Sequence, residues 1–242
     1  MQSIAIITDI HGNAAALEAV LRDISRRRIR EIYCLGDVVA IGPDTDRVFE
    51  LLLAQGNITF ISGNHNIALQ RAFRREEPPP GNHMERGHHE WLAQRIAPHY
   101  VELMSRWPMT ASAVLEGVPV LFTHYHLDQA GWYKPVDWNP TAEGLWRLYT
   151  ETDYRLVIFG DHHVVHHFCA GRITFFNPGA LGCAHSADAI ARYGIVTLQN
   201  GDVTAEAVEV AYDNREFLHS YEELGVPDKE TILRIFHGRD SH

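Results

Sequence analysis

The sequence predicts an α/β fold, and two observations support that class. Short apolar, β-branched runs alternate along the first third of the chain with segments whose apolar residues recur at helical spacing. Each run stops at glycine, asparagine, aspartate or histidine, the residue types at which strands give way to loops. The chain has 242 residues, of which 45% are hydrophobic, so it is long enough for one large domain with a buried core.

The first elements form a strand–helix–strand unit. The run at 4–8 predicts a buried strand, and the apolar spacing that follows predicts a helix over 14–24 with Asn13 as its N-cap. A second strand is predicted at 31–35, so the sheet begins with parallel strands. The pattern continues with a helix at 44–55, a strand at 58–62 and a helix that runs through Leu69.

Residues 71–107 interrupt this pattern, and we expect them to form an insertion within a single domain that spans 1–242. The segment 71–86 is highly charged and contains three consecutive prolines, which predicts a surface loop. One or two helices, broken at Pro98, are predicted over 88–106. We expect the histidines of the insertion to be solvated; they are His83, His88 and His89.

Strands and hairpins resume after the insertion. The aromatic loop at 132–140 could stack on a base or a sugar, but we expect its side chains to pack locally. The predicted elements are strands at 112–115, 118–122, 156–159, 164–168, 173–176, 193–198 and 203–210, and helices at 141–150, 213–224 and 228–236.

Composition excludes several classes of protein. The formal net charge of -10 argues against a protein that holds a long nucleic acid by charge alone. No apolar run approaches the length of a membrane span, and the opening run is too short for a signal peptide. Three cysteines without CxxC spacing suit a reducing compartment. We therefore expect a cytoplasmic protein with a small substrate, and the oligomeric state cannot be predicted.

Metal-competent side chains follow five of the predicted strands. In an extended segment Asp9 and His11 would point to the same side, because side chains alternate along a strand. Ligands of open α/β sheets bind outside the carboxyl ends of strands, so these side chains are expected to converge. They are Asp9 and His11; Asp37; Asn64 and His65; His124; and Asp161, His162 and His163.

The ligand types predict the metals. Carboxylate, imidazole and amide oxygen without thiolate suit divalent Mn, Fe, Zn, Co or Ni. Six or seven ligands exceed one tetrahedral zinc and indicate two ions, a centre that can clamp a phosphoryl group. One carboxylate must bridge the ions, and Asp37 is the candidate because it lies between the two ligand groups in chain order.

These blocks resemble the signature of the calcineurin-like metallophosphoesterase superfamily, and they occur in the family's order across 8–182. The opening segment 8–13 and Asn177-Pro178-Gly179 are similar to its small bacterial and archaeal phosphodiesterase branch. The blocks are Asp9-Ile10-His11, Gly36-Asp37, Gly63-Asn64-His65, Thr123-His124 and the segment 160–163.

The resemblance implies a four-layer α-β-β-α sandwich of two mixed sheets flanked by helices. It implies a phosphoesterase, first of all a phosphodiesterase, in which a metal-bridging hydroxide attacks phosphorus. The substrate would be a small phosphorylated molecule, with a nucleotide as one candidate. His65 would contact the phosphate and protonate the leaving oxygen. The implied ligands are Asp9, His11 and His163 for one ion, Asn64 and His124 for the other, and Asp37 for both.

Two positions depart from the family pattern. Asp161 stands where a second-metal histidine is expected; its harder oxygen would shift the preference toward Mn or Mg, and we favour Mn. Alternatively, His162 takes that place or the second site is weak. Asn66 stands where an acidic residue usually follows the histidine and orients it, which leaves the orientation of His65 open. His126 is a candidate to support the ligands from behind.

The departures keep two other functions open. A degenerate second site would give a non-catalytic metal- or nucleotide-binding protein. A phosphoprotein phosphatase is the second alternative within the enzyme class, although the chain shows no obvious peptide-docking segment.

Overall fold

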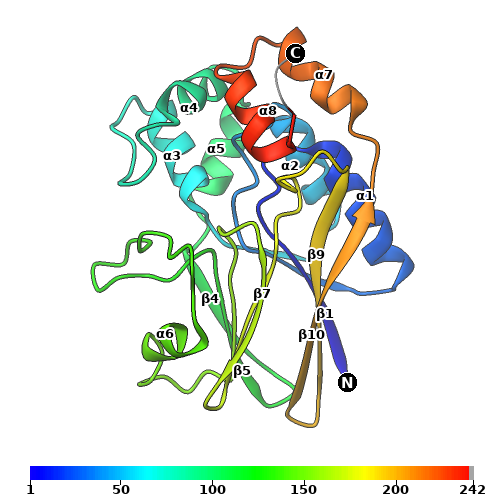
Figure 1. The fold of residues 1–242 in the computed structure, drawn as a ribbon, viewed down its shortest axis with the longest axis vertical. Helices are drawn as coiled ribbons and strands as arrows, with labels where there is room; N and C mark the ends of the chain where they lie inside the picture. The colour runs from blue at the N-terminus through cyan, green and yellow to red at the C-terminus, as the bar shows by residue number, and fades with distance from the viewer. Residues whose placement is uncertain (240–242) are drawn as a thin grey trace.

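Two mixed five-stranded sheets, flanked by helices, make up the chain in a computed structural model that describes residues 1–239 (Figure 1). The first sheet has the order β10-β9-β1-β2-β3, formed by β1 (Gln2–Ile7), β2 (Glu31–Cys34), β3 (Ile58–Phe60), β9 (Ile190–Gln199) and β10 (Asp202–Ala211). The second has the order β4-β5-β6-β8-β7, formed by β4 (Thr110–Leu115), β5 (Val118–Thr123), β6 (Leu156–Ile158), β7 (Val165–Ala170) and β8 (Ile173–Pro178).

Alternation along β1 explains the layers. Ile4 and Ile6 belong to a core shared with Phe122 and Ile158 of the second sheet, so the two sheets pack face to face. Ala5 and its alternate neighbours lie in a second core against the helices of the first sheet. Strands covered on both faces read as continuous apolar runs, as the run at 4–8 does. The predicted four-layer α-β-β-α sandwich is therefore confirmed.

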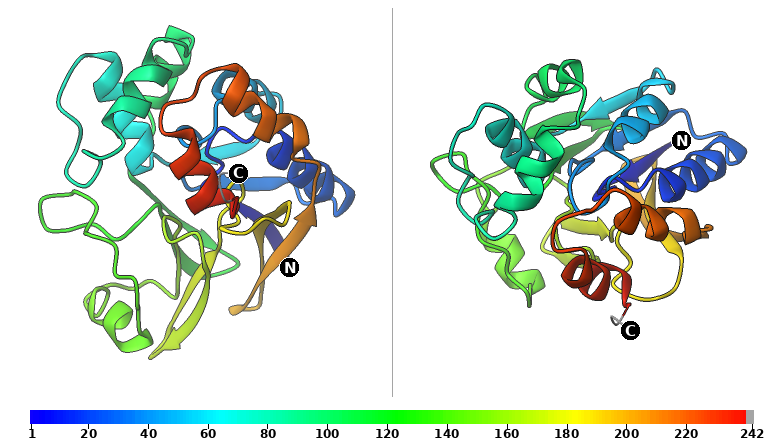
Figure 2. Two further views of the ribbon diagram at one scale, coloured as in Figure 1. Left: turned by 45° about the horizontal axis from the view of Figure 1, so that its top comes forward. Right: turned by 90° about the horizontal axis from the view of Figure 1, so that it is seen from above.

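Eight helices are described. Their bounds are α1 (Ala14–Arg26), α2 (Thr45–Leu53), α3 (Asn64–Phe73), α4 (Arg86–Ala93), α5 (Pro98–Met104), α6 (Ala142–Arg147), α7 (Arg215–Glu223) and α8 (Lys229–His237). Helix α6 covers the outer face of the second sheet through Leu145, and the others gather around the first sheet and its carboxyl end. Figure 2 shows the insertion helices and α8 flanking the same end of the molecule. Within residues 1–239, no helix is both long and apolar enough to cross a bilayer.

The structure corrects two local predictions. Asp9 and His11 do not lie in an extended segment, because β1 ends at Ile7 and both residues have positive φ, 53° and 50°. In the insertion, His83 is exposed as expected, but His88 and His89 are not solvated: their exposed fractions are 5% and 1%. Sequence patterning missed this because a short helix next to a charged loop reads as surface when its packing partners are distant in sequence.

His237 anchors the end of α8 to α7. Its Nε2 atom lies 3.2 Å from the hydroxyl oxygen of Tyr221, and its ring is buried beside Phe217. Burial, with smaller contributions from His185 and Arg239, lowers the pKa of His237 to about 4. The neutral form is therefore the one that the folded chain accommodates.

Acid is expected to destabilise the fold through His237. The unfolded chain binds a proton there below about pH 6.5, whereas the folded chain does so only near pH 4, so the free energy of unfolding falls as pH drops through that window. The loss from this one group is at most about 3 kcal/mol. Urea unfolding at pH 7 and pH 4.5 of chelator-treated protein measures it. His237→Phe should reduce the loss in free energy of unfolding between pH 7 and pH 4.5. His219→Gln, at an exposed histidine of α7, should leave that loss unchanged. An equal loss in the unaltered chain and in both variants would contradict the prediction.

Candidate metal centre

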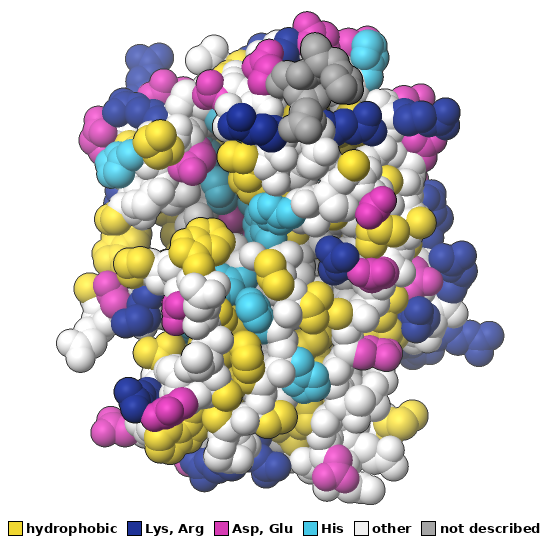
Figure 3. Space-filling model, viewed as in Figure 1, with side chains coloured by type: hydrophobic (Ala, Val, Ile, Leu, Met, Phe, Trp, Pro, Cys, Tyr) yellow, Lys and Arg dark blue, Asp and Glu magenta, His cyan; other side chains and the backbone are white. Residues whose placement is uncertain are grey.

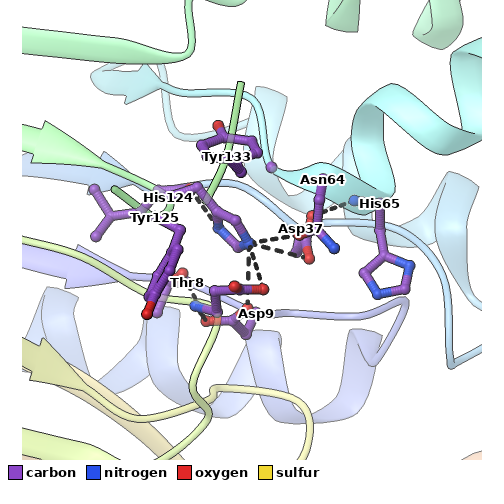
Figure 4. A network of polar contacts seen from close by, with 12 residues as sticks. Thr8, Asp9, Asp37, Asn64, His65, His124, Tyr125 and Tyr133 are labelled. Carbon is purple, nitrogen blue, oxygen red and sulfur yellow. Dashed lines mark hydrogen bonds and ion pairs between the residues drawn. The ribbon is translucent and has the colours of Figure 1, made fainter. Parts of the chain in front are cut away.

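Loops from both sheets meet at the carboxyl ends of their parallel strands. Backbone hydrogen bonds hold them in register: the amide of His11 donates to the carbonyl of Asp37 at 2.9 Å, and the amide of Gly160 donates to the carbonyl of His124 at 2.8 Å. β1, β2 and β3 run parallel in one sheet, and β5, β6 and β8 run parallel in the other. The five predicted blocks therefore reach one place, and Figure 4 shows residues of the first four.

Two glycines give the carboxylates room. A Cβ atom on Gly63 would lie 2.1 Å from Oδ1 of Asp37, and one on Gly160 would lie 2.8 Å from Oδ2 of Asp9. Any side chain at either position would displace a carboxylate. The glycines of these two blocks are thus required by the close approach of neighbouring loops.

Each buried carboxylate has one oxygen bound by the protein and one left free. Oδ2 of Asp9 accepts hydrogen bonds from the hydroxyl of Thr8 at 2.8 Å and the amide of Asp161 at 3.1 Å. Oδ1 of Asp37 accepts one from the amide of His65 at 2.9 Å. Among the described residues, no donor reaches Oδ1 of Asp9 or Oδ2 of Asp37, and both atoms are buried.

The first group of predicted ligands surrounds Oδ1 of Asp9. This atom lies 3.7 Å from Nε2 of His11 and 3.4 Å from Nε2 of His163, and the two imidazole nitrogens are 3.0 Å apart. Cys183 also brings a ligand atom within 4.8 Å of both histidines.

The second group surrounds Nε2 of His124. The side-chain oxygen of Asn64 lies 2.9 Å away, Oδ2 of Asp37 3.2 Å and Oδ1 of Asp161 3.5 Å. In Figure 4 the carboxylates of Asp9 and Asp37 point toward His124, while the ring of His65 lies to one side. The two groups adjoin, since Oδ1 of Asp9 is 3.9 Å from the same nitrogen of His124.

The tautomers of these imidazoles follow from their outer contacts. Nδ1 of His11 faces the carbonyl of Val39 at 3.1 Å, and Nδ1 of His124 faces the carbonyl of Leu35 at 2.9 Å, so each Nδ1 carries the proton. Nδ1 of His163 faces Nε2 of His185 at 2.9 Å, and Nδ1 of His185 in turn donates to the carbonyl of Ile235 at 3.0 Å. When the imidazoles are neutral, as metal binding requires, all three Nε2 atoms therefore present lone pairs to the centre.

Acceptors face acceptors throughout this centre, which is the arrangement that a cation satisfies. Buried lone pairs 3 Å apart repel one another, and a free buried carboxylate oxygen carries a desolvation cost. The donor set of imidazole, carboxylate and amide oxygen fits divalent transition metals such as manganese. The residues thus fit the ions that the sequence predicts.

The pKa shifts show the same demand for positive charge. Burial raises the pKa of Asp37, and the nearby imidazole of His124 offsets only part of that shift. Burial by itself would lower the pKa of His124, but Asp37, Asp161 and Asp9 outweigh it and hold the pKa well above 6.5. Burial by itself would raise the pKa of Asp9, but the neighbouring imidazoles of His163, His124 and His11 outweigh it, and the pKa lies below its ordinary value. Without metal, the centre therefore draws in a proton at His124.

His65 lies beside the centre and is paired with a histidine that the sequence did not single out. Its Nδ1 atom is 2.9 Å from Nε2 of His89, which comes from α4 of the insertion. One of the two rings donates to the other in this contact, and Nε2 of His65 is left as the nitrogen open to a substrate. Burial and the neighbouring imidazole of His89 lower the pKa of His65 well below 6.5.

Asn66 does not orient His65. Its side-chain oxygen accepts hydrogen bonds from the amides of Asp37 at 2.8 Å and Gly63 at 2.9 Å, and the residue is fully buried. Asn66 therefore ties the second and third blocks together, and His89 contacts His65 instead.

The structure turns two other histidines away from the centre. Nδ1 of His162 lies 2.8 Å from Nε2 of His166, and its ring stacks on Trp138, so Asp161 rather than His162 faces His124. Nδ1 of His126 contacts the hydroxyl of Tyr149 at 2.8 Å on the far side of the strand. His126 thus lies outside the shell that supports the ligands.

Two nearby residues, Cys183 and His185, escaped the sequence reasoning, and His89 was expected to be solvated. All three reach the centre through tertiary packing. Only Cys183 had a sequence signal, because it lies shortly after the Asn-Pro-Gly segment. The amides of Leu181 and Gly182 donate to the carbonyls of Thr8 and Asp9 in the loop that follows β1.

Comparison with known proteins finds relatives that match nearly the whole chain in sequence or in fold. The chain is 25% identical over 244 residues to an uncharacterized protein of Methanocaldococcus jannaschii, with 91% of each chain covered. Its fold is similar to a hypothetical protein of Pyrococcus horikoshii OT3 (TM-score 0.79, 16% identity, 100% of both chains). It is also similar to a metallophosphoesterase of Sphaerobacter thermophilus (TM-score 0.71, 22% identity, 97% of this chain and 98% of that one).

The family model of the calcineurin-like phosphoesterase superfamily domain matches residues 2–201, a span that contains all five blocks and every strand of the two sheets except β10. The predicted resemblance is therefore confirmed, and the chain belongs to the calcineurin-like phosphoesterase superfamily.

Proposed function

We propose that the protein is a metal-dependent phosphoesterase that hydrolyses small phosphate esters, with phosphodiesters as its main substrates. The observation that carries the proposal is the pair of buried carboxylate oxygens, on Asp9 and Asp37, that face imidazole lone pairs and have no donor among the described residues. The similarity of the opening block and of the Asn-Pro-Gly segment to the small phosphodiesterase branch favours diesters over phosphoproteins.

We assign the ligands as two sets that share Asp37. Asp9, His11 and His163 would hold one ion, and Asn64, His124 and Asp161 the other, with Mn²⁺ favoured because Asp161 supplies a hard oxygen. When bound, the ions supply charge that neutralises phosphoryl oxygens and acidify water near neutral pH.

The residues of the chain then act around the phosphoryl group. Water adds its oxygen to phosphorus, the bond from phosphorus to the alcohol oxygen breaks, and that oxygen takes a proton. His65 stands beside the ligands with Nε2 free and supplies the proton. Asp9 and Asp37 stay fixed during the step, because each is held through its second oxygen.

Metal loading is expected to give two ions per chain and to switch on hydrolysis. Chelator-treated protein should be inert toward bis(4-nitrophenyl) phosphate, and Mn²⁺ should restore turnover and raise the thermal unfolding midpoint, because metal binds only the folded site. Elemental analysis after gel filtration counts the ions. Two ions without turnover on a panel of mono- and diesters would instead indicate a binding protein, and phosphopeptides in the panel test the phosphatase alternative.

We also propose a cytoplasmic location. Its support is the cysteine usage, since Cys34, Cys169 and Cys183 are all free. Fractionation of cells that produce the protein tests this location.

A further inference from the structure

We propose that the cavity between α4 and α8 binds the alcohol that leaves the phosphorus, and that this alcohol is partly apolar and bears no negative charge. The inference rests on the proposed function, because it concerns the half of the substrate that hydrolysis releases. It names a substrate class that the ligand residues alone do not define.

The cavity adjoins the centre through His65. It has a volume of about 430 Å³, within the range of small-molecule sites, and His65 forms part of its wall. The ring of His65 lies 5.3 Å from that of the ligand His11. A phosphoryl group at the metals would thus place its leaving oxygen near His65 and the rest of the alcohol in this cavity. In Figure 3 histidine side chains gather on this face beneath α8.

Apolar side chains line much of the cavity. Phe236 and Ile235 come from α8, and Ile41 comes from the loop that follows Asp37. Ile41 has a φ of 61°, a conformation that β-branched residues rarely adopt and that costs of order 1 kcal/mol or more. Met84, on the insertion, also lines the cavity although 90% of its surface is exposed. Strain and exposed apolar surface at one wall indicate that a ligand packs there.

His88 contributes an uncharged part of the cavity wall. It lines the cavity with 5% of its surface exposed, and both of its ring nitrogens are buried. Burial lowers the pKa of His88 to about 4, so it is neutral at physiological pH and offers no positive charge to an anionic alcohol.

The charges of the wall disfavour an anionic alcohol. Glu85 and Asp228 line the cavity from opposite sides, and none of the described residues that line it is lysine or arginine. The nearest cation in sequence, Arg86, is engaged with Glu77 at 2.9 Å and with Glu90 at 2.8 Å. An alcohol that carries a phosphate or carboxylate would meet two uncompensated carboxylates.

Two substrates with leaving groups of similar acidity and different charge test the inference. We expect Mn²⁺-loaded protein to hydrolyse methyl 4-nitrophenyl phosphate with kcat/KM about tenfold above that for methyl 3-carboxy-4-nitrophenyl phosphate. The variant Glu85→Gln/Asp228→Asn should narrow this ratio by raising the rate with the anionic leaving group. The control Glu76→Gln/Glu230→Gln removes the same charge from exposed positions of the insertion and of α8 outside the cavity, and it should leave the ratio unchanged.

Ligand-observed NMR on metal-free protein provides a readout independent of turnover. Benzyl alcohol should show saturation transfer and 4-(hydroxymethyl)benzoate should not, and Thr231→Trp, which fills the cavity from α8, should remove the signal. Inert protein that still shows this selective binding would contradict the proposed hydrolysis and retain the cavity as a ligand site. Active protein with no leaving-group preference, or binding that Thr231→Trp leaves intact, would overturn the inference.

Discussion

Asp37→Asn is expected to abolish hydrolysis, with a loss of at least about 10³-fold in kcat, and to lower the metal content from two ions to at most one per chain. Oδ2 of Asp37 is the buried, donor-free oxygen that adjoins His124, and an amide at this position carries no charge and turns an N–H group toward the ligands in one of its two orientations. Elemental analysis and diester hydrolysis, on the same preparation, measure both effects.

The stability of the metal-free variant separates a lost ligand from a lost fold. Asp37 is buried beside the imidazole of His124, so Asp37→Asn removes one partner of a buried pair, and a cooperative unfolding transition of the metal-free variant is the check that the fold is retained. Asp202→Asn, at an exposed position of β10, is the matched control and should change neither metal content nor rate. If Asp37→Asn keeps two ions and full activity, Asp37 is not the shared ligand.

His65→Ala is expected to slow hydrolysis by about 10²–10⁴-fold for alkyl leaving groups and far less for 4-nitrophenol, with two ions still bound. A good leaving group departs without a proton, so the loss should grow as the leaving alcohol becomes less acidic. A series of phosphodiesters with leaving alcohols of graded acidity measures that slope. An equal loss for every leaving group would mean that His65 binds phosphate and transfers no proton.

Substitution of His89, which contacts His65, should also slow hydrolysis most for poorly acidic leaving alcohols. His89→Leu removes the hydrogen bond that holds the ring of His65 and should reduce kcat for poor leaving groups about tenfold with little change in KM or metal content. His89→Gln, which can still hydrogen-bond with Nδ1 of His65, should recover part of the loss. His83→Leu changes an exposed histidine of the same insertion and serves as the control. A uniform loss with all substrates in His89→Leu would mark a purely structural role.

Much of the fold could be predicted because its signals are local. The run at 4–8, the Asn13 cap and the neighbouring strands predicted at 193–198 and 203–210 each depend on residues close in sequence, and the structure contains β1, α1 and the β9–β10 pair at those places. The side chain of Asn13 accepts from the amide of Ala16 at 3.0 Å, as an N-cap does. The backbone conformation of the ligand loops was not predictable, because Asp9, His11 and Asp37 adopt positive φ only where neighbouring loops hold them.

The sequence by itself determined the α/β class, the parallel start of the first sheet and the order of the five blocks, and these blocks identified the family and through it the layered fold. Only the tertiary structure decided which atoms face the centre: Asp161 rather than His162 beside His124, and His89 rather than Asn66 beside His65. The physical reason is that the contacts of a side chain depend on packing between segments far apart in the chain. A rotation about one side-chain bond decides whether a residue faces the centre or packs elsewhere.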